Sequence, residues 1–217
     1  MINVVVSRYQ RNTDFVEELT NVAPVNIMVY DKCKPENPYN VPVNRGHETS
    51  VYLKYIIDHY ETLSEYTFFI HDENKSWHHD GTIAERFKEA IDSGEKFYNI
   101  NNEYFTSFNC ITEKKELMEW YREYIEEYIP YEKLPNKDWL AGGTYKISAQ
   151  FLVHKSLILN LPKHFYERHY EYAIAPHPEP KLIAYFLEWT WHLFWVIYPE
   201  FRHLFPWGFL RWYINIF

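Results

Sequence analysis

Glycine and cysteine are scarce in this chain, and acidic residues outnumber basic ones. Only 6 of the 217 residues are glycine, and none follows the first predicted strand, which excludes a dinucleotide-binding fingerprint and a P-loop. The two cysteines, Cys33 and Cys110, are too few and too far apart for a disulfide scaffold, and they favour a reducing, cytoplasmic compartment. The 22 Lys and Arg against 30 Asp and Glu give a net charge of −8, which argues against a nucleic-acid-binding protein.

Aromatic residues, in contrast, make up 20 % of the chain and are concentrated towards its carboxyl end. Residues 185–217 include 14 Phe, Trp or Tyr among 33 positions. The chain is 47 % hydrophobic, which is enough to bury a core and excludes intrinsic disorder. The most apolar segment, 182–198, carries Glu188 and His192 near its middle, so we expect no membrane span. We expect the rings to form a packed C-terminal lid over one wall of a site.

The hydrophobic pattern alternates between strand-like and helix-like segments. Short runs of β-branched and aromatic residues predict strands at 2–6, 26–30, 66–70 and 148–153. Helical spacing and capping signals predict helices at 13–19, 49–60, 82–91, 112–128, 165–173 and 181–198. A turn is expected at 141–143 and a proline-rich hinge at 176–180. This order predicts a single α/β domain, with a mostly parallel sheet, helices on both faces, and an aromatic C-terminal helix and tail.

Polar residues follow each of the first three predicted strands. In an open parallel sheet, ligands bind beyond the carboxyl ends of the strands. One polar strand end is ordinary, but three together indicate a candidate site. If that site binds phosphate, the lack of a glycine-rich loop means that a metal ion, or Arg8 and Lys32, must supply the positive charge. The strand-end residues are Ser7, Arg8 and Tyr9, then Asp31 and Lys32, then His71, Asp72 and Glu73.

The segment 71–81 has the densest group of chemically active side chains. It contains three His and three carboxylates directly after a hydrophobic strand. Hard divalent cations prefer carboxylate oxygens, and Mn²⁺ also accepts imidazole. Asp72 is the first candidate metal ligand because it lies nearest the strand end, and His71 and His78 are alternatives. Asp80 is a candidate general base, although the histidines and Asp80 also fit an ordinary loop that precedes a helix.

A second candidate pair lies on the last predicted helix. Glu188 and His192 are four residues apart and share one helix face, within a run rich in tryptophan. Burying a carboxylate and an imidazole among rings is costly unless they are paired or bind a ligand. Either they pair and hold the helix in place, or they serve a site, with Glu188 as a general base and His192 as a distal metal ligand.

A third candidate is the polar turn at 44–49, which opens a predicted helix. A helix N-terminus favours anions, so Arg45 and the neighbouring amides are candidates for contact with phosphate. Asn44 and Glu48 are candidates for hydrogen bonds to a sugar hydroxyl, and His47 belongs to the same turn. Helix capping alone explains part of this pattern.

Several blocks of the sequence together resemble a known family. They occur in order over nearly the whole chain, so the resemblance concerns the domain as a whole. The family comprises GT-A-type glycosyltransferase domains that help chlorella viruses to glycosylate their major capsid protein, together with fungal proteins of uncharacterised function. The blocks that resemble it are 5–9, 29–32, 44–48, 69–71 with 77–78, 149–153 and 188–192.

The resemblance implies a GT-A fold, a nucleotide-diphosphate sugar donor and Mn²⁺ or Mg²⁺ as the cofactor. It places the segment 71–73 where GT-A enzymes carry an Asp-X-Asp metal motif, although this chain has a single Asp flanked by His and Glu. It also matches His192 to a late histidine of the metal and diphosphate site. The residues assigned to the donor site are Ser7, Arg8, Tyr9, Asp31, Lys32, Asn44, Arg45, His47 and Glu48.

These observations predict a metal-dependent glycosyltransferase. It would move a sugar of glucose or rhamnose type from a UDP-sugar to a glycan or glycoprotein acceptor such as a viral capsid protein, in the host cytoplasm if the chain is viral. Residues 1–110 would form the nucleotide-binding half and 111–217 the acceptor side, and a longer parent chain with further domains is compatible with this. The alternatives are a metal-dependent hydrolase of a phosphate or sugar ester and a non-catalytic carbohydrate-binding module.

Overall fold

The computed structural model describes residues 1–101, 104–105, 111–130, 145–146, 149–176 and 182–197. Its strands are β1 Ile2–Arg8, β2 Val25–Asp31, β3 Tyr66–His71, β4 Phe97–Asn99, β5 Tyr104–Phe105, β6 Tyr145–Lys146 and β7 Phe151–His154. Five of them form an open sheet in the order β2-β1-β3-β7-β4, and β5 pairs with β6 separately. β1 is parallel to β2 and β3, whereas β7 is antiparallel to β3 and β4.

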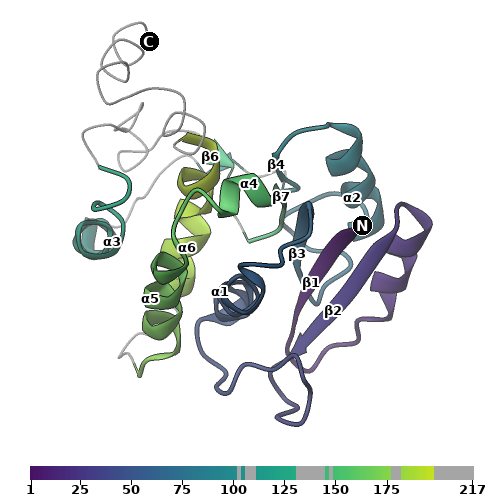
Figure 1. Ribbon diagram of the computed structural model, residues 1–217, viewed down its shortest axis with the longest axis horizontal. Helices are drawn as coiled ribbons and strands as arrows, with labels where there is room; N and C mark the ends of the chain where they lie inside the picture. Colours follow the sequence, from purple (N-terminus) through teal and green to yellow (C-terminus); the bar gives the residue numbers. More distant parts are fainter. Residues whose placement is uncertain (102–103, 106–110, 131–144, 147–148, 177–181, 198–217) are drawn as a thin grey trace, which may run out of the picture.

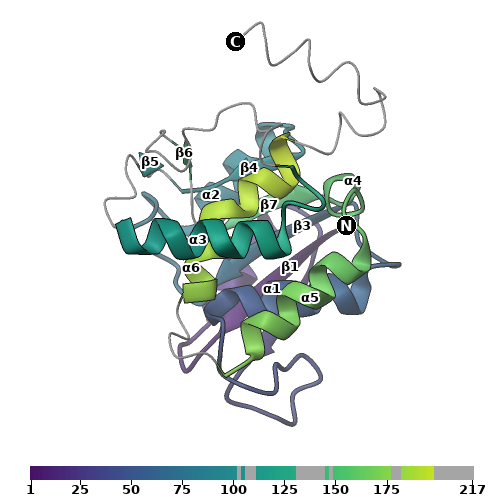
Figure 2. The ribbon, with the colours of Figure 1, turned by 90° about the vertical axis from the view of Figure 1, so that its left-hand side faces the viewer.

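Helices lie on both faces of this sheet (Figure 1). Viewed from the side, α1, α3, α5 and α6 stand in front of the strands (Figure 2), while α2 and η1 pack on the opposite face. The bounds are η1 Asp14–Asn21, a 3₁₀ helix, α1 His47–His59, α2 Ile83–Asp92, α3 Ile111–Tyr124, α4 Lys155–Ile158, α5 Lys163–Ile174, α6 Leu182–His192 and the π-helical segment η4 Leu193–Ile197.

The valines of β1 show how the two faces arise from the sequence. Val5 packs with Tyr52 of α1 in one hydrophobic cluster, whereas Val4 and Val6 pack with Phe87 of α2 in another. Successive side chains of a strand point to opposite faces. A strand that is apolar at each of these positions is therefore buried on both sides, as strands of an α/β sheet are.

The predicted α/β class and the first three strands are confirmed, but the sheet is mixed rather than mostly parallel. The predicted strand at 148–153 appears as β7, which is antiparallel to its neighbours. The strand β4 was not predicted, because three residues are too few to show an alternating pattern. The predicted turn at 141–143, most of the hinge at 176–180 and the tail beyond residue 197 lie outside the described residues.

Two helix starts position the loops around the sheet's carboxyl end. Thr82 and Glu85 form the predicted capping box at α2, where the Thr82 hydroxyl accepts a hydrogen bond from the Glu85 amide and the Glu85 carboxylate accepts one from the Thr82 amide. At α1, Gly46 has φ +65° and approaches Ala173 of α5 so closely that a Cβ would lie 3.0 Å from it. Glycine is needed there for both its conformation and its size.

In the part of the chain that the structure describes, no helix is long and apolar enough to cross a membrane. α6 packs instead against the other helices and the sheet, with Phe186, Leu187 and Trp191 buried.

Candidate functional site

A cleft of about 880 Å³ opens at the carboxyl ends of the parallel strands. This is the edge at which open α/β sheets bind their ligands, and the volume is near the upper end of the range for small-molecule pockets, about 300–1,000 Å³. Strand ends form one wall, the amino-terminal part of α6 forms another, and the turn before α1 lies between them. The lining residues are Ser7, Tyr9, Arg11, Lys32, Asn44, Arg45, Gly46, His47, Glu48, His71, Asp72, Glu73, Trp77, His78, Ala149, Ala184, Tyr185, Glu188 and Trp189.

The register of the parallel strands brings the predicted strand-end residues together. Ser7 at the end of β1 is paired with Tyr30 of β2 and with His71 of β3. One residue further, Arg8 is paired with Asp31. The expectation that the three strand ends converge on one place is thus confirmed, because parallel strands in register end at the same edge.

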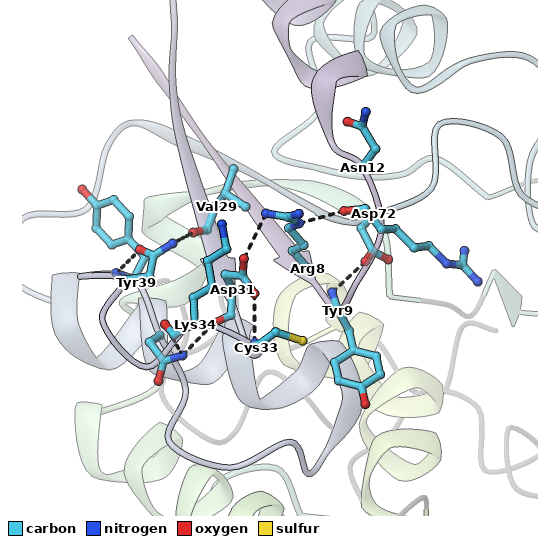
Figure 3. Close-up of polar contacts among 12 residues, drawn as sticks. Arg8, Tyr9, Asn12, Val29, Asp31, Cys33, Lys34, Tyr39 and Asp72 are labelled. Carbon is cyan, nitrogen blue, oxygen red and sulfur yellow. Dashed lines mark hydrogen bonds and ion pairs between the residues drawn. The ribbon is translucent and has the colours of Figure 1, made fainter.

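Arg8 and Asp31 form an ion pair beside the cleft (Figure 3). The Arg8 guanidinium donates to Asp31 Oδ2 at 2.9 Å, and the Cys33 amide donates to Oδ1 at 2.9 Å. The Asp31 side chain is 2 % exposed, and neither residue of the pair is among those that line the cavity. This geometry fixes the start of the loop after β2, and the predicted contact of both residues with a donor stays a prediction.

Asp72 and its neighbours form the other half of the strand-end wall. One Asp72 carboxylate oxygen accepts a hydrogen bond from the Tyr9 amide at 2.7 Å (Figure 3), which joins the ends of β1 and β3. Glu73 forms an ion pair with Arg11. Burial lowers the pKa of His71 to about 3, with further lowering from His78, His79 and Arg11. His71 therefore presents a neutral imidazole at neutral pH.

Lys32 contributes a positive charge to the strand-end side of the cleft. Its ammonium donates to the backbone carbonyls of Arg45 and His47, which ties the end of β2 to the turn before α1. Burial lowers the pKa of Lys32 to about 8, although Glu48 and Asp72 act in the opposite direction. The Arg45 guanidinium donates to the Ile174 carbonyl at the end of α5, at 3.0 Å.

α6 contributes a different kind of wall. Tyr185, Glu188 and Trp189 line the cleft at spacing i, i+3 and i+4, which places them on one face of the helix. Burial raises the pKa of Glu188 to about 8, with a further contribution from the Glu48 carboxylate. Burial raises the pKa of the Tyr52 hydroxyl, and Glu48, Asp72 and Glu188 raise it further, so carboxyl groups from three separate segments act on one region.

Like Arg8 and Asp31, two further predicted site residues do not line the cleft. His192 lies one helical turn beyond Glu188, at the end of α6, and Asp80 lies in the loop just before the capping box of α2. Their proposed roles stay predictions. Sequence reasoning did not include Arg11, Trp77, Tyr185 or Trp189 among the site residues. For Tyr185 and Trp189 the helical spacing around Glu188 was a usable signal.

Among the described residues, the cleft offers single carboxylate and imidazole groups rather than a complete set of protein ligands for a metal ion. No group of three or more His, Cys, Asp or Glu side chains among the described residues is arranged to hold a metal ion. A hard cation carried by a diphosphate needs only one or two carboxylates, because phosphate oxygens and water complete its shell. Asp72, with one carboxylate oxygen not engaged by Tyr9, suits that requirement, and His71 and His78 lie in the same wall.

The fold and the cleft define an α/β protein with an open mixed sheet and a ligand-sized site at the carboxyl ends of its parallel strands. The chain belongs to the family described as "Protein of unknown function (DUF3431)", which matches residues 4–201. No curated protein and no solved structure matches the chain.

Proposed function

We propose that the protein is a glycosyltransferase that moves a sugar from a nucleotide-diphosphate donor, such as a UDP-sugar, to a glycan acceptor. The observation that carries the proposal is the cleft itself, in which the polar ends of three parallel strands face a largely buried carboxyl group on α6. The sequence resemblance to GT-A domains points in the same direction, and a sheet with three parallel strands followed by an antiparallel one is compatible with that fold.

The strand-end wall would hold the charged half of the donor. Lys32 and Arg11 supply positive charge to the cleft, and the amino-terminal end of α1 opens into it at Gly46, His47 and Glu48. A helix N-terminus attracts anions. These groups replace the glycine-rich loop that the sequence lacks.

Asp72, aided by His71 or His78, would hold a Mn²⁺ or Mg²⁺ ion carried by the donor diphosphate. When bound, such an ion neutralises the charge that develops on a leaving diphosphate. The protein's own residues fix the position of the Asp72 carboxylate. The Tyr9 amide donates a hydrogen bond to one Asp72 oxygen at 2.7 Å, and the neutral His71 offers a lone pair to the ion without adding a positive charge.

Transfer forms a bond between an acceptor hydroxyl oxygen and the anomeric carbon while the bond from that carbon to the β-phosphate oxygen breaks. The nucleoside diphosphate leaves with the electron pair, and the hydroxyl proton passes to a base. Glu188 suits that role because a general base works best with a pKa near the operating pH, and burial raises the pKa of Glu188 to about 8.

The direct experiment is to incubate the protein with a panel of UDP-sugars and Mn²⁺, first alone and then with candidate glycans, and to measure free UDP and glycosylated product. We expect slow UDP release without acceptor and faster, product-linked release with the correct one. Phosphate or sugar-ester hydrolysis with no acceptor dependence would identify a hydrolase instead. Turnover of no UDP-sugar by either route would contradict the proposal.

A further inference from the structure

Exposed aromatic rings are concentrated at the cleft. The large hydrophobic side chains that are exposed among the described residues are Met1, Tyr9, Trp77, Leu159 and Tyr185. Three of these five, Tyr9, Trp77 and Tyr185, line the cavity. Exposed apolar surface that gathers at one place usually marks a binding surface, so the rim of the cleft has a recognition role beyond that of its charged groups.

Two rings of α6 form a flat surface on this rim. Tyr185 and Trp189 are stacked with ring centroids 5.9 Å apart and an angle of only 12° between their planes. Tyr185 is 42 % exposed and Trp189 is partly buried against the core. Other rings of the same helix, including Phe186 and Trp191, are buried in the core. The aromatic residues of α6 therefore divide into a core set and a cleft pair.

The charges beside this pair favour a neutral, hydroxyl-rich ligand over an anion. Glu188 lies on the same helix face as the two rings, and Glu48 is near enough to raise its pKa. The Glu48 charge repels phosphates and sulfates, and a largely protonated Glu188 can both donate and accept hydrogen bonds with hydroxyl groups. The positive groups Lys32 and Arg11 belong to the strand-end and turn side of the cleft.

We propose that Tyr185 and Trp189 form the acceptor subsite, on which the apolar C–H face of a neutral pyranose of an oligosaccharide stacks while Glu188 contacts its hydroxyls. Burial of such a face against a ring is favourable because aromatic side chains offer a large and rigid apolar surface. This inference rests on the proposed function and adds to it the chemical class and the position of the acceptor. A cleft of about 880 Å³ has room for a sugar beside a donor.

Binding can be measured without turnover. A panel of neutral oligosaccharides of glucose, galactose, mannose and xylose is titrated by calorimetry into the wild-type protein, Tyr185→Ala, Tyr185→Phe and the control Leu159→Ala, which removes an exposed side chain that does not line the cleft. UDP with Mn²⁺ is titrated into the same proteins, and circular dichroism verifies the fold. Because Tyr185 is substantially exposed, its replacement should leave the fold intact.

We expect at least one oligosaccharide to bind, with an affinity that falls about tenfold in Tyr185→Ala, the size of one lost stacking contact. Tyr185→Phe and Leu159→Ala should stay within about twofold of the wild type, and UDP affinity should not change in Tyr185→Ala. The inference is overturned if no oligosaccharide binds, if Tyr185→Ala binds as the wild type does, or if that variant loses UDP affinity instead. Sugar binding that depends on Tyr185, in a protein that does not bind UDP, would support the proposed sugar subsite and contradict the proposed transferase activity.

Discussion

The charged side chains on the two walls of the cleft differ in whether they are paired with other groups of the protein. On the strand-end wall and just behind it, Arg8 is paired with Asp31, Arg11 with Glu73, and Asp72 with the Tyr9 amide. On the α6 wall, no hydrogen bond or ion pair joins the Glu188 carboxyl to another described residue, and burial and then the Glu48 charge raise its pKa.

This difference separates two uses of a buried charge. Paired charges fix the positions of loops and ligand-holding groups, and they are already satisfied before any ligand arrives. A carboxyl group without a partner raises its pKa instead and remains able to accept or give a proton near neutral pH. In the proposed enzyme the strand-end wall is the holding surface and the α6 wall is the reacting and acceptor surface.

The largest expected effect comes from removing the Glu188 carboxyl. Glu188→Gln keeps the size of the side chain but cannot act as a base, so we expect transfer to slow by about 10²–10⁴-fold with little change in donor affinity. In the wild type the rate should rise with pH towards a plateau above about 8, where Glu188 is ionised, and this dependence should disappear in the variant. Rates of UDP release against pH measure both effects.

The matched control is Glu171→Gln, which changes an exposed carboxylate of α5. It should leave the rate and its pH dependence unchanged. A Glu188→Gln variant that turns over as fast as the control would show that the α6 carboxyl is not the base, and it would remove the functional contrast between the two walls.

Breaking a pair on the opposite side should affect stability first. Asp31→Asn leaves the Arg8 guanidinium facing a neutral amide and weakens the acceptor for the Cys33 amide, which should lower the free energy of unfolding by about 2–3 kcal/mol. Urea denaturation measures the loss. Asp92→Asn breaks a surface pair with Lys88 and should cost less than about 1 kcal/mol; equal losses in the two variants would contradict the structural role of Asp31.

A smaller effect should appear in the pH dependence of stability. The pKa of Glu188 is raised to about 8 from an ordinary value of 4.5, so the folded state binds this proton more tightly than the unfolded state between these pH values. The stabilising contribution is complete below pH 4.5 and is lost as the pH rises through 8. Its slope cannot exceed about 1.4 kcal/mol per pH unit.

Comparing wild type with Glu188→Gln isolates this contribution, because His71, whose lowered pKa makes stability rise with pH between about 3 and 6.5, is present in both. The variant should gain stability relative to the wild type from pH 5 to pH 8 in urea denaturation. A difference between the two proteins that does not change with pH would mean that Glu188 is solvated and not held in a largely buried site.

The sequence predicted the parts of the fold that depend on local pattern. β-branched runs identified β1, β2 and β3, and Thr82 with Glu85 identified the start of α2. Because parallel strands end at one edge, the meeting of Ser7 and His71 followed from topology alone. The antiparallel direction of β7 could not be predicted, because it depends on how distant parts of the chain are connected. The three-residue β4 is too short for its pattern to be recognised.

The candidate site was predictable as a location and less so in its details. The contact of Arg8 and Asp31 with a donor stays a prediction, whereas their pairing with each other could not be predicted, because no local pattern reveals strand register. His192 was grouped with Glu188 by its i+4 spacing, yet four residues advance about 6 Å along a helix, and this carries His192 past the residues that line the cleft. Tyr185 and Trp189, which are four residues apart and flank Glu188 in the chain, share a helix face that lines the cleft.

The most direct test of the proposed transferase is whether the cleft binds a nucleoside diphosphate through Asp72. Calorimetric titration with UDP, with and without Mn²⁺, tests this directly in the wild-type protein, in Asp72→Ala and in the control Asp92→Asn. We predict UDP binding that Mn²⁺ strengthens in the wild type and in the control, and loss of the Mn²⁺-dependent part in Asp72→Ala with the fold retained. Absence of UDP binding under both conditions would contradict the transferase, and unchanged Mn²⁺-dependent affinity in Asp72→Ala would move the metal site to the histidines.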